Sequence, residues 1–211
     1  LAEATATSFF PAKPLGCYGD GGAVFTDDGD LAAVMRSLRV HGKGTDKYDT
    51  VRIGVNSRLD TIQAAVLLAK LTVFAAEITE RQRIAARYRE RLAGAPGVEL
   101  PSPAPSAWAQ YTFRVAGASA VNRDGMTAAL GAHGVATAVY YPRALHDQPA
   151  YAGRYGDSGS CARSTLLAEQ VLSVPMHPYL EESSQERVAA AVRAASAGQG
   201  AVDESPVDAF L

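Results

Sequence analysis

The sequence of 211 residues contains only two cysteines, Cys17 and Cys161, and a single tryptophan. The two cysteines do not have the spacing of metal ligands and do not indicate a disulfide framework. Charge is nearly balanced, with a formal net charge of −2. The chain therefore has no broad positive field, and neither a metal ion nor a nucleic acid is an expected partner.

Long hydrophobic runs are also missing from the sequence. No uninterrupted apolar run approaches the roughly 20 residues that a membrane-spanning helix needs, so no membrane partner is expected. The first ten residues lack the positive region of a signal peptide and indicate a strand instead. The 47% of hydrophobic residues and 20% of charged residues are typical of a globular protein. These features favour a cytoplasmic protein of one large or two small domains.

What the sequence does contain is a concentrated motif near its start, SFFPAKPLGCYGDGGA at residues 8–23. It places Lys13 between Pro11 and Pro14. Because proline cannot donate to a β-ladder or sit inside a helix, Lys13 is predicted to lie on an irregular loop. The glycines that follow permit backbone geometry that a side chain would forbid. A lysine held on such a turn is a candidate Schiff-base nucleophile, whereas most lysines are solvated surface residues.

Short strands and a helix are predicted around this motif. Strands are expected at residues 5–10 and 22–26. Asp28 is placed to cap a helix that ends near Arg39. A polar loop with two glycines follows at residues 41–47, and such loops often line binding sites.

The most regular segment of the sequence covers residues 57–93. Ser57 and Asp60 resemble a capping box, and apolar residues then recur at helical spacing. The pattern predicts one long helix, or two helices joined near Thr72. Glycine and proline at residues 94–105 indicate the best domain boundary.

Strands and helices alternate beyond this boundary, which predicts a compact α/β domain at residues 106–195. The first domain is expected to cover residues 1–93, and the glycine-rich, acidic segment 196–211 is predicted to be disordered. Ser183 and Glu186 are interpreted as the capping box of the last helix. The expected strands are 111–115, 135–141 and 171–174, and the expected helices are 123–133, 158–168 and 184–195.

The motif around Lys13 resembles the pyridoxal-phosphate lysine loop of the DegT/DnrJ/StrS family of sugar-nucleotide aminotransferases. Further segments continue the resemblance almost to residue 195: GVNSRLDTIQAAVL from Gly54, AQYTFRV, AVYYPRALHDQPAY and LSVPMHPYL. The resemblance implies an α/β, fold-type-I aminotransferase, with residues 1–93 as the end of the large cofactor domain and a small C-terminal α/β domain after it. It also implies that Lys13 binds pyridoxal 5′-phosphate (PLP) covalently and is the catalytic base.

Family members carry roughly as much chain again before this lysine, a size expected for a two-domain enzyme. The sequence is therefore expected to be the second half of such an enzyme. By resemblance, its first two strands belong to a larger sheet, and an open sheet edge favours aggregation or pairing with another chain. The 211 residues alone are expected to be poorly soluble unless another segment covers that edge.

The resemblance assigns roles to three more residues of the first domain. Ser8 is expected to bind the cofactor phosphate, although a strand-end hydroxyl bonded to backbone would explain it equally. Asn56 and Arg58 lie at the predicted helix start, where free N–H groups attract anions and where an arginine opposes the helix dipole unless an anion is present. The resemblance implies that Asn56 meets the cofactor phosphate and Arg58 the carboxylate of the substrate or the amino donor, both in a neighbouring subunit's site. The alternative is a solvated arginine.

Tyr140 and Tyr141 precede Pro142 in the second domain. The resemblance implies that this pair contacts the sugar nucleotide, although close relatives often have histidine at the first position. Two strand aromatics packed on a neighbouring face are the alternative. His177 is interpreted as a structural turn residue, and His41 as a residue that could meet the substrate.

The leading hypothesis is a PLP-dependent aminotransferase that moves an amino group from glutamate to a keto sugar linked to UDP or dTDP. It would act in cell-surface polysaccharide or aminosugar biosynthesis, as a homodimer with shared active sites. Lys13 argues against a sugar dehydratase of the same fold, because histidine replaces the lysine there. The remaining alternative is a non-catalytic fragment or a binding module of this fold.

Overall fold

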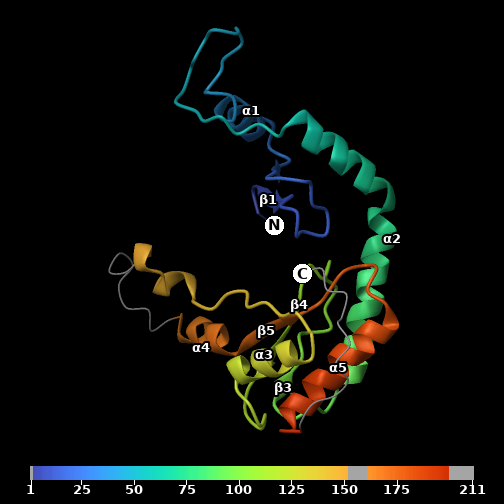
Figure 1. Cartoon of the computed structure of the whole chain (residues 1–211). Coiled ribbons are helices and arrows are strands. Elements are labelled where there is room, and N and C mark those ends of the chain that lie inside the picture. The colour runs from blue at the N-terminus through green and yellow to red at the C-terminus, as the bar shows by residue number, and fades with distance from the viewer. Residues whose placement is uncertain (1, 152–160, 200–211) are drawn as a thin grey trace. The chain divides into compact units, whose positions relative to one another are not determined.

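The structure is a computed structural model that describes residues 2–151 and 161–199. The chain divides into two compact units between Ala75 and Ala76 (Figure 1). This division lies inside α2 (Thr61–Leu92), which is one continuous helix of 32 residues. The alternative of two helices joined near Thr72 is therefore wrong. The sequence placed a boundary after the helix, whereas the contacts place its second half within the second unit.

The first unit begins with a hairpin that carries the lysine loop at its tip. Strands β1 (Thr5–Ser8) and β2 (Gly22–Phe25) pair antiparallel, with Thr5 opposite Phe25 and Ser8 opposite Gly22. Helix α1 (Gly29–Leu38) follows, and the carboxylate of Asp28 accepts hydrogen bonds from the backbone N–H groups of Asp30 and Leu31. The predicted cap is confirmed, and it satisfies donors that a helix start leaves free.

The predicted start of the long helix at Ser57 is wrong. Ser57 N–H donates to the carbonyl of Arg39, and Val55 N–H donates to the carbonyl of Leu38. Together with the bridge between Val40 and Asn56, these bonds hold residues 55–57 in an extended path beside the chain after α1, and α2 begins only at Thr61. The first intrahelical bond in this region runs from Ala64 N–H to the carbonyl of Asp60, so Asp60 lies at the helix start and the Ser57–Asp60 box does not form.

The second unit is built around a three-stranded antiparallel sheet of order β3-β4-β5. The strands are β3 (Val98–Glu99), β4 (Tyr111–Val115) and β5 (Val171–Val174). In β4, Tyr111, Phe113 and Val115 are buried and alternate with half-buried residues, as expected for a strand with one face on a core. The strands predicted at 111–115 and 171–174 are confirmed.

Besides the second half of α2, the described part of this unit contains the helices α3 (Arg123–Ala132), α4 (Ala162–Gln170) and α5 (Glu182–Ser196). Helix α3 contacts both α5 and the sheet, and α4 contacts β4 (Figure 1). Short 3-10 turns, η1 (Leu145–Asp147) and η2 (Pro149–Tyr151), lie between α3 and α4. Residues 158–160 of the predicted helix 158–168 and residues 200–211 of the predicted tail 196–211 fall outside the described residues.

Two predictions for this unit are wrong. The strand expected at 135–141 is a single bridge, in which Ala138 and Ser173 exchange two backbone hydrogen bonds of 3.1 and 2.8 Å. The segment therefore meets β5 at one residue and forms no ladder. The capping box of Ser183 and Glu186 is also absent, because α5 begins earlier and its N-cap is Glu181, which makes no side-chain cap bond.

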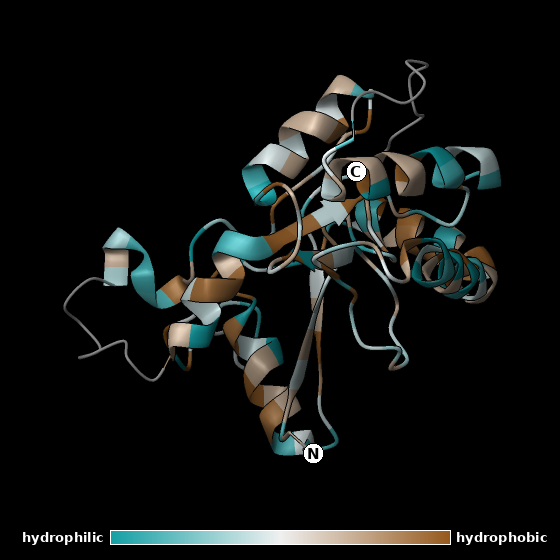
Figure 2. Cartoon of the chain, turned by 90° about the horizontal axis from the view of Figure 1, so that it is seen from below, coloured by the Kyte–Doolittle hydropathy of each residue, from teal (hydrophilic) through white to brown (hydrophobic). Residues whose placement is uncertain are grey.

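A contiguous apolar core holds the second unit together. Tyr88 and Tyr111 lie at its centre with ring centroids 4.9 Å apart, and the Tyr88 hydroxyl donates to the carbonyl of Pro175 at 3.0 Å. Burial raises the pKa of Tyr111 to about 12 and raises that of Tyr88 further still. The largest buried side chains come from α2, β4, α3 and β5: Tyr88, Tyr111, Phe113, Ile84, Leu92, Met126, Leu130 and Leu172. Figure 2 shows the hydropathy of the residues along the ribbon of the chain.

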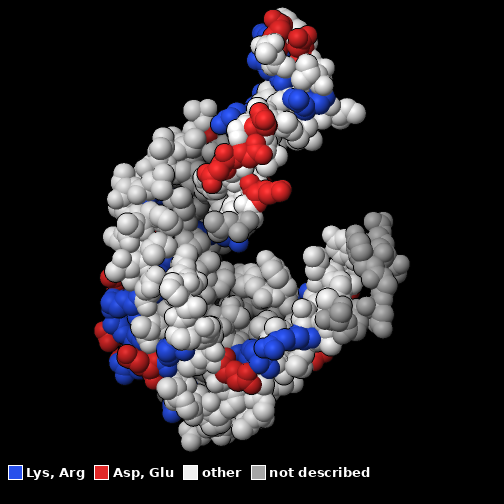
Figure 3. All heavy atoms as spheres, turned by 180° about the vertical axis from the view of Figure 1, so that it is seen from behind, with Lys and Arg blue, Asp and Glu red and all other residues white. Residues whose placement is uncertain are grey.

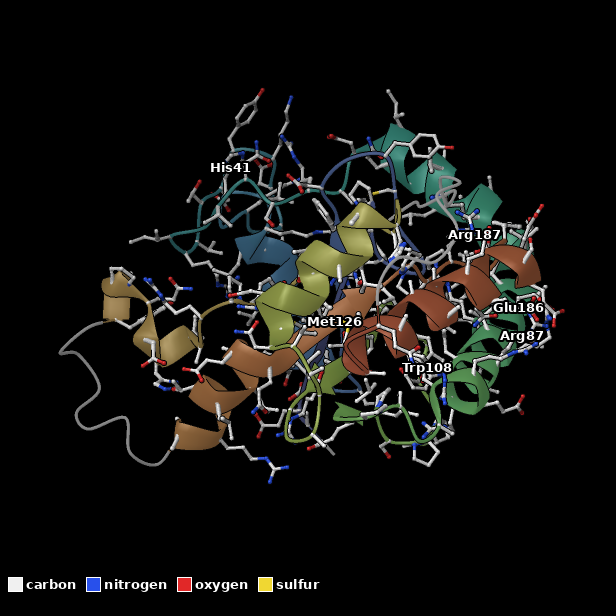
Figure 4. The ribbon with its side chains drawn as sticks, turned by 60° about the horizontal axis from the view of Figure 1, so that its bottom comes forward. His41, Arg87, Trp108, Met126, Glu186 and Arg187 are labelled. Carbon is white, nitrogen blue, oxygen red and sulfur yellow. The ribbon has the colours of Figure 1, made fainter. Side chains whose placement is uncertain are left out.

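Helix α2 joins α5 through charged side chains on the surface of the second unit. Arg87 pairs with Glu182 at 2.9 Å, and Arg91 pairs with Glu186. Figure 3 shows positive and negative side chains gathered together on this face, and Figure 4 shows Arg87 and Glu186 extending from facing helices. Ion pairs this exposed contribute at most about 1 kcal/mol each, so the core accounts for more of this packing than the charges do.

By length and composition alone, α2 could also cross a membrane, with a mean hydropathy of 1.6 over its most apolar stretch and 6% of that stretch buried. The sequence contains no uninterrupted apolar run of this length, because Gln63, Lys70 and Thr72 lie among the apolar residues of the helix. Both halves of this helix nevertheless contact other parts of the chain. Its second half lies in the core of the second unit, and Lys70 bonds to the lysine loop.

Candidate active site

The lysine loop is closed by backbone hydrogen bonds at its base. Phe9 N–H donates to the carbonyl of Gly21, and Cys17 N–H donates to the carbonyl of Phe9, both at 2.8 Å. A tighter turn lies inside this closure, where Lys13 N–H donates to the carbonyl of Phe10 at 2.8 Å. The two prolines exclude regular structure, as predicted, and these bonds give the irregular backbone one defined path.

The interior of the loop is filled by small groups. The buried thiol of Cys17 donates to the carbonyls of Phe9 and Gly19, each at 3.0 Å. A Cβ atom on Gly16 would lie 2.6 Å from the carbonyl oxygen of Pro11, so only glycine allows the two backbone segments to approach. The glycine-rich sequence is therefore needed here for close packing.

Lys13 extends from this rigid loop with an exposed side chain. Among the residues that the structure describes, none forms a hydrogen bond or ion pair with its Nζ. An amine without an internal partner is available to condense with an aldehyde, and this is the property that a covalently bound PLP requires. The residues present therefore fit this cofactor at the position of Lys13.

Helix α2 contacts the lysine loop at two points that the sequence interpretation missed. Lys70 Nζ donates to the carbonyl of Gly16 at 2.6 Å, and its ammonium group lies 5.1 Å from the ring centroid of Tyr18. Gln63 Oε1 accepts a hydrogen bond from Tyr18 N–H at 2.8 Å. A sequence signal did exist, since Lys70 is the only charged residue between Asp60 and Glu77, and a charge in an apolar helix needs a partner.

Ser8 lies at the end of β1, at the base of the same loop. Its hydroxyl oxygen accepts a hydrogen bond from Phe10 N–H at 3.2 Å. This is the backbone role that the sequence left open, and it leaves the hydroxyl proton free to donate to a phosphate oxygen. Both proposed uses of Ser8 are compatible with this geometry.

Asn56 and Arg58 lie in the extended segment before α2. Asn56 forms a bridge with Val40, and its Oδ1 accepts a hydrogen bond from Arg58 Nε at 3.1 Å. Because α2 begins at Thr61, Arg58 is not in a first helical turn, and the argument from the helix dipole is wrong. The two side chains are exposed and bonded to each other, so they form one polar unit that leaves the terminal guanidinium nitrogens available for an anion.

The predicted polar loop at residues 41–47 lies in the chain between α1 and this extended segment. His41 has a φ of 60° and donates through its N–H to the carbonyl of Val55 at 3.0 Å. A second bridge joins Lys43 to Thr50. Figure 4 labels His41, the first residue of this loop. Its side chain is exposed, and its contact with a substrate stays a prediction.

Tyr140 and Tyr141 belong to the second unit and lie on the segment after the Ala138 bridge. They are 38% and 68% exposed, with ring centroids 5.6 Å apart in an edge-to-face arrangement. Neither residue lies in a strand, so the alternative of two strand aromatics does not hold, and their contact with a sugar nucleotide stays a prediction. The segment that follows them is anchored by Thr165 of α4, which donates to Asp147 at 2.8 Å and lies 3.2 Å from His146 Nε2.

His177 lies after β5 beside a buried arginine. Burial lowers the pKa of its imidazole, and the nearby charge of Arg81 lowers it further. Arg81 itself is buried and donates to the carbonyls of Trp108 and Met176 at 2.9 and 3.3 Å. This arrangement connects α2 to the segments before β4 and after β5, which agrees with the structural interpretation of His177.

The structure brings some of the candidates together and leaves others apart. Ser8 and Lys13 share one loop, and Asn56 and Arg58 are bonded to each other within the same unit. Tyr140 and Tyr141 belong to the other unit. No three histidine, cysteine, aspartate or glutamate side chains gather to hold a metal ion in the described part of the chain.

Comparison with known proteins gives a consistent result. The sequence matches the model of the DegT/DnrJ/EryC1/StrS aminotransferase family over residues 1–193. It is 46% identical, over 91% of this chain and 52% of the relative, to a UDP-2-acetamido-2-deoxy-3-oxo-D-glucuronate aminotransferase of Pseudomonas aeruginosa. It is 43% identical, over 91% of this chain and 50% of the relative, to a dTDP-3-amino-3,4,6-trideoxy-alpha-D-glucose transaminase of Streptomyces venezuelae.

A solved structure agrees in fold. A DegT/DnrJ/EryC1/StrS aminotransferase from Brucella abortus superposes with a TM-score of 0.85 at 49% identity, over 92% of this chain and 51% of that protein. The predicted fold class, the fold-type-I aminotransferase fold, is confirmed. The chain spans about half the length of the relatives that it matches.

Proposed function

Because the chain belongs to the DegT/DnrJ/EryC1/StrS aminotransferase family, we propose that the protein is a PLP-dependent aminotransferase. It transfers an amino group, with glutamate as donor, to a keto group of a sugar linked to a nucleotide. The observation that carries this proposal is the exposed amine of Lys13 on a loop fixed by hydrogen bonds and glycine packing.

Lys13 has two tasks in this reaction. Its Nζ would hold PLP covalently between reactions, and as a free amine it would accept a proton from the carbon that carries the amino group of the donor. PLP, when bound, supplies the electron sink that makes this proton removable. Since the loop bonds fix the backbone of Lys13, only the flexible side chain has to move between these tasks.

Polar residues of the first unit would hold the anionic groups. The hydroxyl of Ser8, at the base of the lysine loop, would donate to the cofactor phosphate, and Asn56 would contribute an amide to a phosphate. The guanidinium of Arg58, oriented by its bond to Asn56, binds a carboxylate of donor or substrate with forked geometry. Removing Arg58 should therefore weaken substrate binding more than cofactor binding.

The sugar nucleotide is the substrate class that the relatives support. One relative is named for a UDP-linked oxo-glucuronate and another for a dTDP-linked trideoxy sugar. Tyr140 and Tyr141 present exposed aromatic faces and hydroxyls, which suit a nucleotide base and a sugar. The setting that we propose is cytoplasmic biosynthesis of an aminosugar or a cell-surface polysaccharide. Neither cysteine is in a disulfide bond, which suits a reducing compartment.

A homodimer with shared sites is the assembly that we propose. Val51, Ile53 and Val55, just before Asn56, are 57%, 97% and 60% exposed. Apolar side chains this exposed favour a partner surface next to the segment that carries Asn56 and Arg58. In a shared site, each subunit supplies Lys13 to one centre and Arg58 to the other.

The test of the reaction uses the full-length protein with glutamate and a panel of UDP- and dTDP-linked keto sugars. Lys13→Ala should lower kcat by about 100- to 10,000-fold, the range for a lost general base. Borohydride reduction should attach the cofactor to Lys13 in the wild type. Arg36→Ala, which removes an exposed cation of α1, is the matched control. Undiminished transamination by Lys13→Ala, or a wild type that stays unlabelled, would reject the proposal and favour a non-catalytic binding module.

Mixing two inactive variants tests the shared site. If Lys13 and Arg58 of one centre come from different subunits, both substitutions of a mixed dimer fall in the same centre, and the other centre is intact. Activity should therefore reappear after the two variants are mixed and allowed to exchange subunits. A mixture that remains inactive, in dimers shown to have exchanged, would place both residues in the same subunit's site.

A further inference from the structure

The stripe of α2 that faces the lysine loop explains how Lys13 is held in position. Gln63, Leu67 and Lys70 are spaced i, i+4 and i+7, so they lie on one face of the helix. Leu67 is 6% exposed, whereas Ile62, Leu68 and Leu71 of the same segment are at least half exposed. Within the first unit, this stripe is therefore the face of α2 that contacts protein.

Lys70 bonds to the lysine loop at Gly16, shortly after the turn that carries Lys13. Its ammonium donates to the carbonyl of Gly16, a charge-assisted hydrogen bond and thus stronger than a neutral one. The backbone of Gly16 in turn packs against Phe10 and Pro11, where a Cβ atom would come within 2.7 and 2.6 Å of their carbonyl oxygens. Any displacement of Gly16 must therefore shift the turn from which Lys13 extends.

Gln63 holds the other side of the loop. Its side-chain oxygen accepts from Tyr18 N–H, and its amide nitrogen would lie 3.2 Å from a Cβ atom on Gly19. Since the ring of Tyr18 also lies beside the Lys70 ammonium, the two helix residues hold the loop cooperatively. The contacts span 45 and 54 residues of sequence, so they are tertiary constraints on the loop.

We propose that Gln63 and Lys70 are positioning residues that fix the loop so that the amine of Lys13 reaches the cofactor in one place. This inference rests on the proposed transamination, in which Lys13 must deliver a proton to defined atoms. Neither residue needs to touch the cofactor or the substrate. A small misplacement of a reacting group lowers a rate by up to about 100-fold, so the contacts act on the chemical step more than on substrate binding.

The test compares Gln63→Leu, Lys70→Met and Lys70→Arg in the full-length protein. The first readout is backbone hydrogen exchange of Lys13 and Cys17 without cofactor, because their N–H groups close the loop. Exchange should become faster in Gln63→Leu and Lys70→Met.

The second readout is steady-state kinetics. The value of kcat should fall about 10- to 100-fold, whereas KM for the sugar nucleotide should change less than about twofold. Lys70→Arg, which keeps a donor, should restore most of both.

Matched controls exclude general effects of the substitutions. Gln82→Leu changes an exposed glutamine of the same helix, and Arg36→Met removes an exposed cation of the same unit. Both should leave loop exchange and kcat unchanged. If Gln63→Leu fails to fold, the pair Lys70→Met and Lys70→Arg still decides the question.

Three results would overturn the inference. The first is loop exchange in the variants equal to that of the controls, and the second is faster exchange with unchanged kcat. The third is a loss of activity that appears in KM alone. If instead the wild type carries out no transamination, the proposed function fails, and the exchange data still report whether Gln63 and Lys70 hold the loop.

Discussion

The two units of the chain are stabilised in different ways. In the second unit, a contiguous set of large side chains from helices and strands is buried. Within residues 2–75, the buried residues are Gly16, Cys17, Ser37, Gly42 and Leu67, and only two of these have an apolar side chain. The first unit is held mainly by backbone hydrogen bonds and close glycine contacts. The candidate catalytic lysine thus lies on the part that has the smaller core and depends more on additional protein.

The largest expected effect concerns folding of the separate units. A fragment of residues 76–199 contains the whole buried cluster and should unfold cooperatively with heat, because burial of apolar area is the dominant favourable term. A fragment of residues 2–75 should show no cooperative transition. Circular dichroism and calorimetry of both fragments measure this difference. A cooperative transition of the first fragment alone would contradict the comparison.

Matched phenylalanine substitutions sharpen the same contrast. Phe113 in β4 is 1% exposed, and Phe25 in β2 is 59% exposed. Phe113→Ala should lower the free energy of unfolding by about 3 to 5 kcal/mol, whereas Phe25→Ala should change it by less than about 0.5 kcal/mol. Denaturant unfolding of the full-length protein, followed for both variants, provides the measurement. Equal effects would mean that the β1–β2 hairpin is buried against protein.

A smaller effect is expected from one hydroxyl group in the core. Tyr88→Phe removes the donor to the carbonyl of Pro175 and leaves that oxygen buried, so stability should fall by about 1 to 3 kcal/mol. Tyr48→Phe, at a side chain 85% exposed, is the control and should be neutral. The midpoint of thermal unfolding measures both. A neutral Tyr88→Phe would show that the carbonyl finds another donor.

The smallest expected effect is the dependence of stability on pH through His177. Its pKa in the folded state is lowered from the ordinary value of 6.5, mainly by burial. The unfolded chain therefore binds more protons in this range, and folded stability is lost as the pH falls below about 6.5. The unfolding midpoint of the second unit should decrease between pH 7 and pH 5, and His177→Gln should reduce the slope. A variant with an unchanged slope would assign the effect to other groups.

Much of the fold was predictable because its signals are local. The cap of Asp28 and the strands at 111–115 and 171–174 each depend on neighbouring residues and were confirmed. The start of α2 was not predictable in this way. Ser57 and Asp60 have the spacing of a capping box, but pairing of residues 55–57 with the chain after α1 prevents the helix from beginning there. A distant backbone partner therefore overrode a local signal.

For the candidate site, the sequence by itself determined that Lys13 stands on an irregular, glycine-packed loop, because proline and glycine restrict the backbone at each position separately. It also determined the family, through motifs that extend over most of the chain. Only the tertiary structure decided that Gln63 and Lys70 reach this loop, that Asn56 orients Arg58, and that residues 135–141 form no strand. Each of these depends on atoms brought together from distant parts of the sequence, and hydrogen bonds of that kind leave no periodic pattern to read.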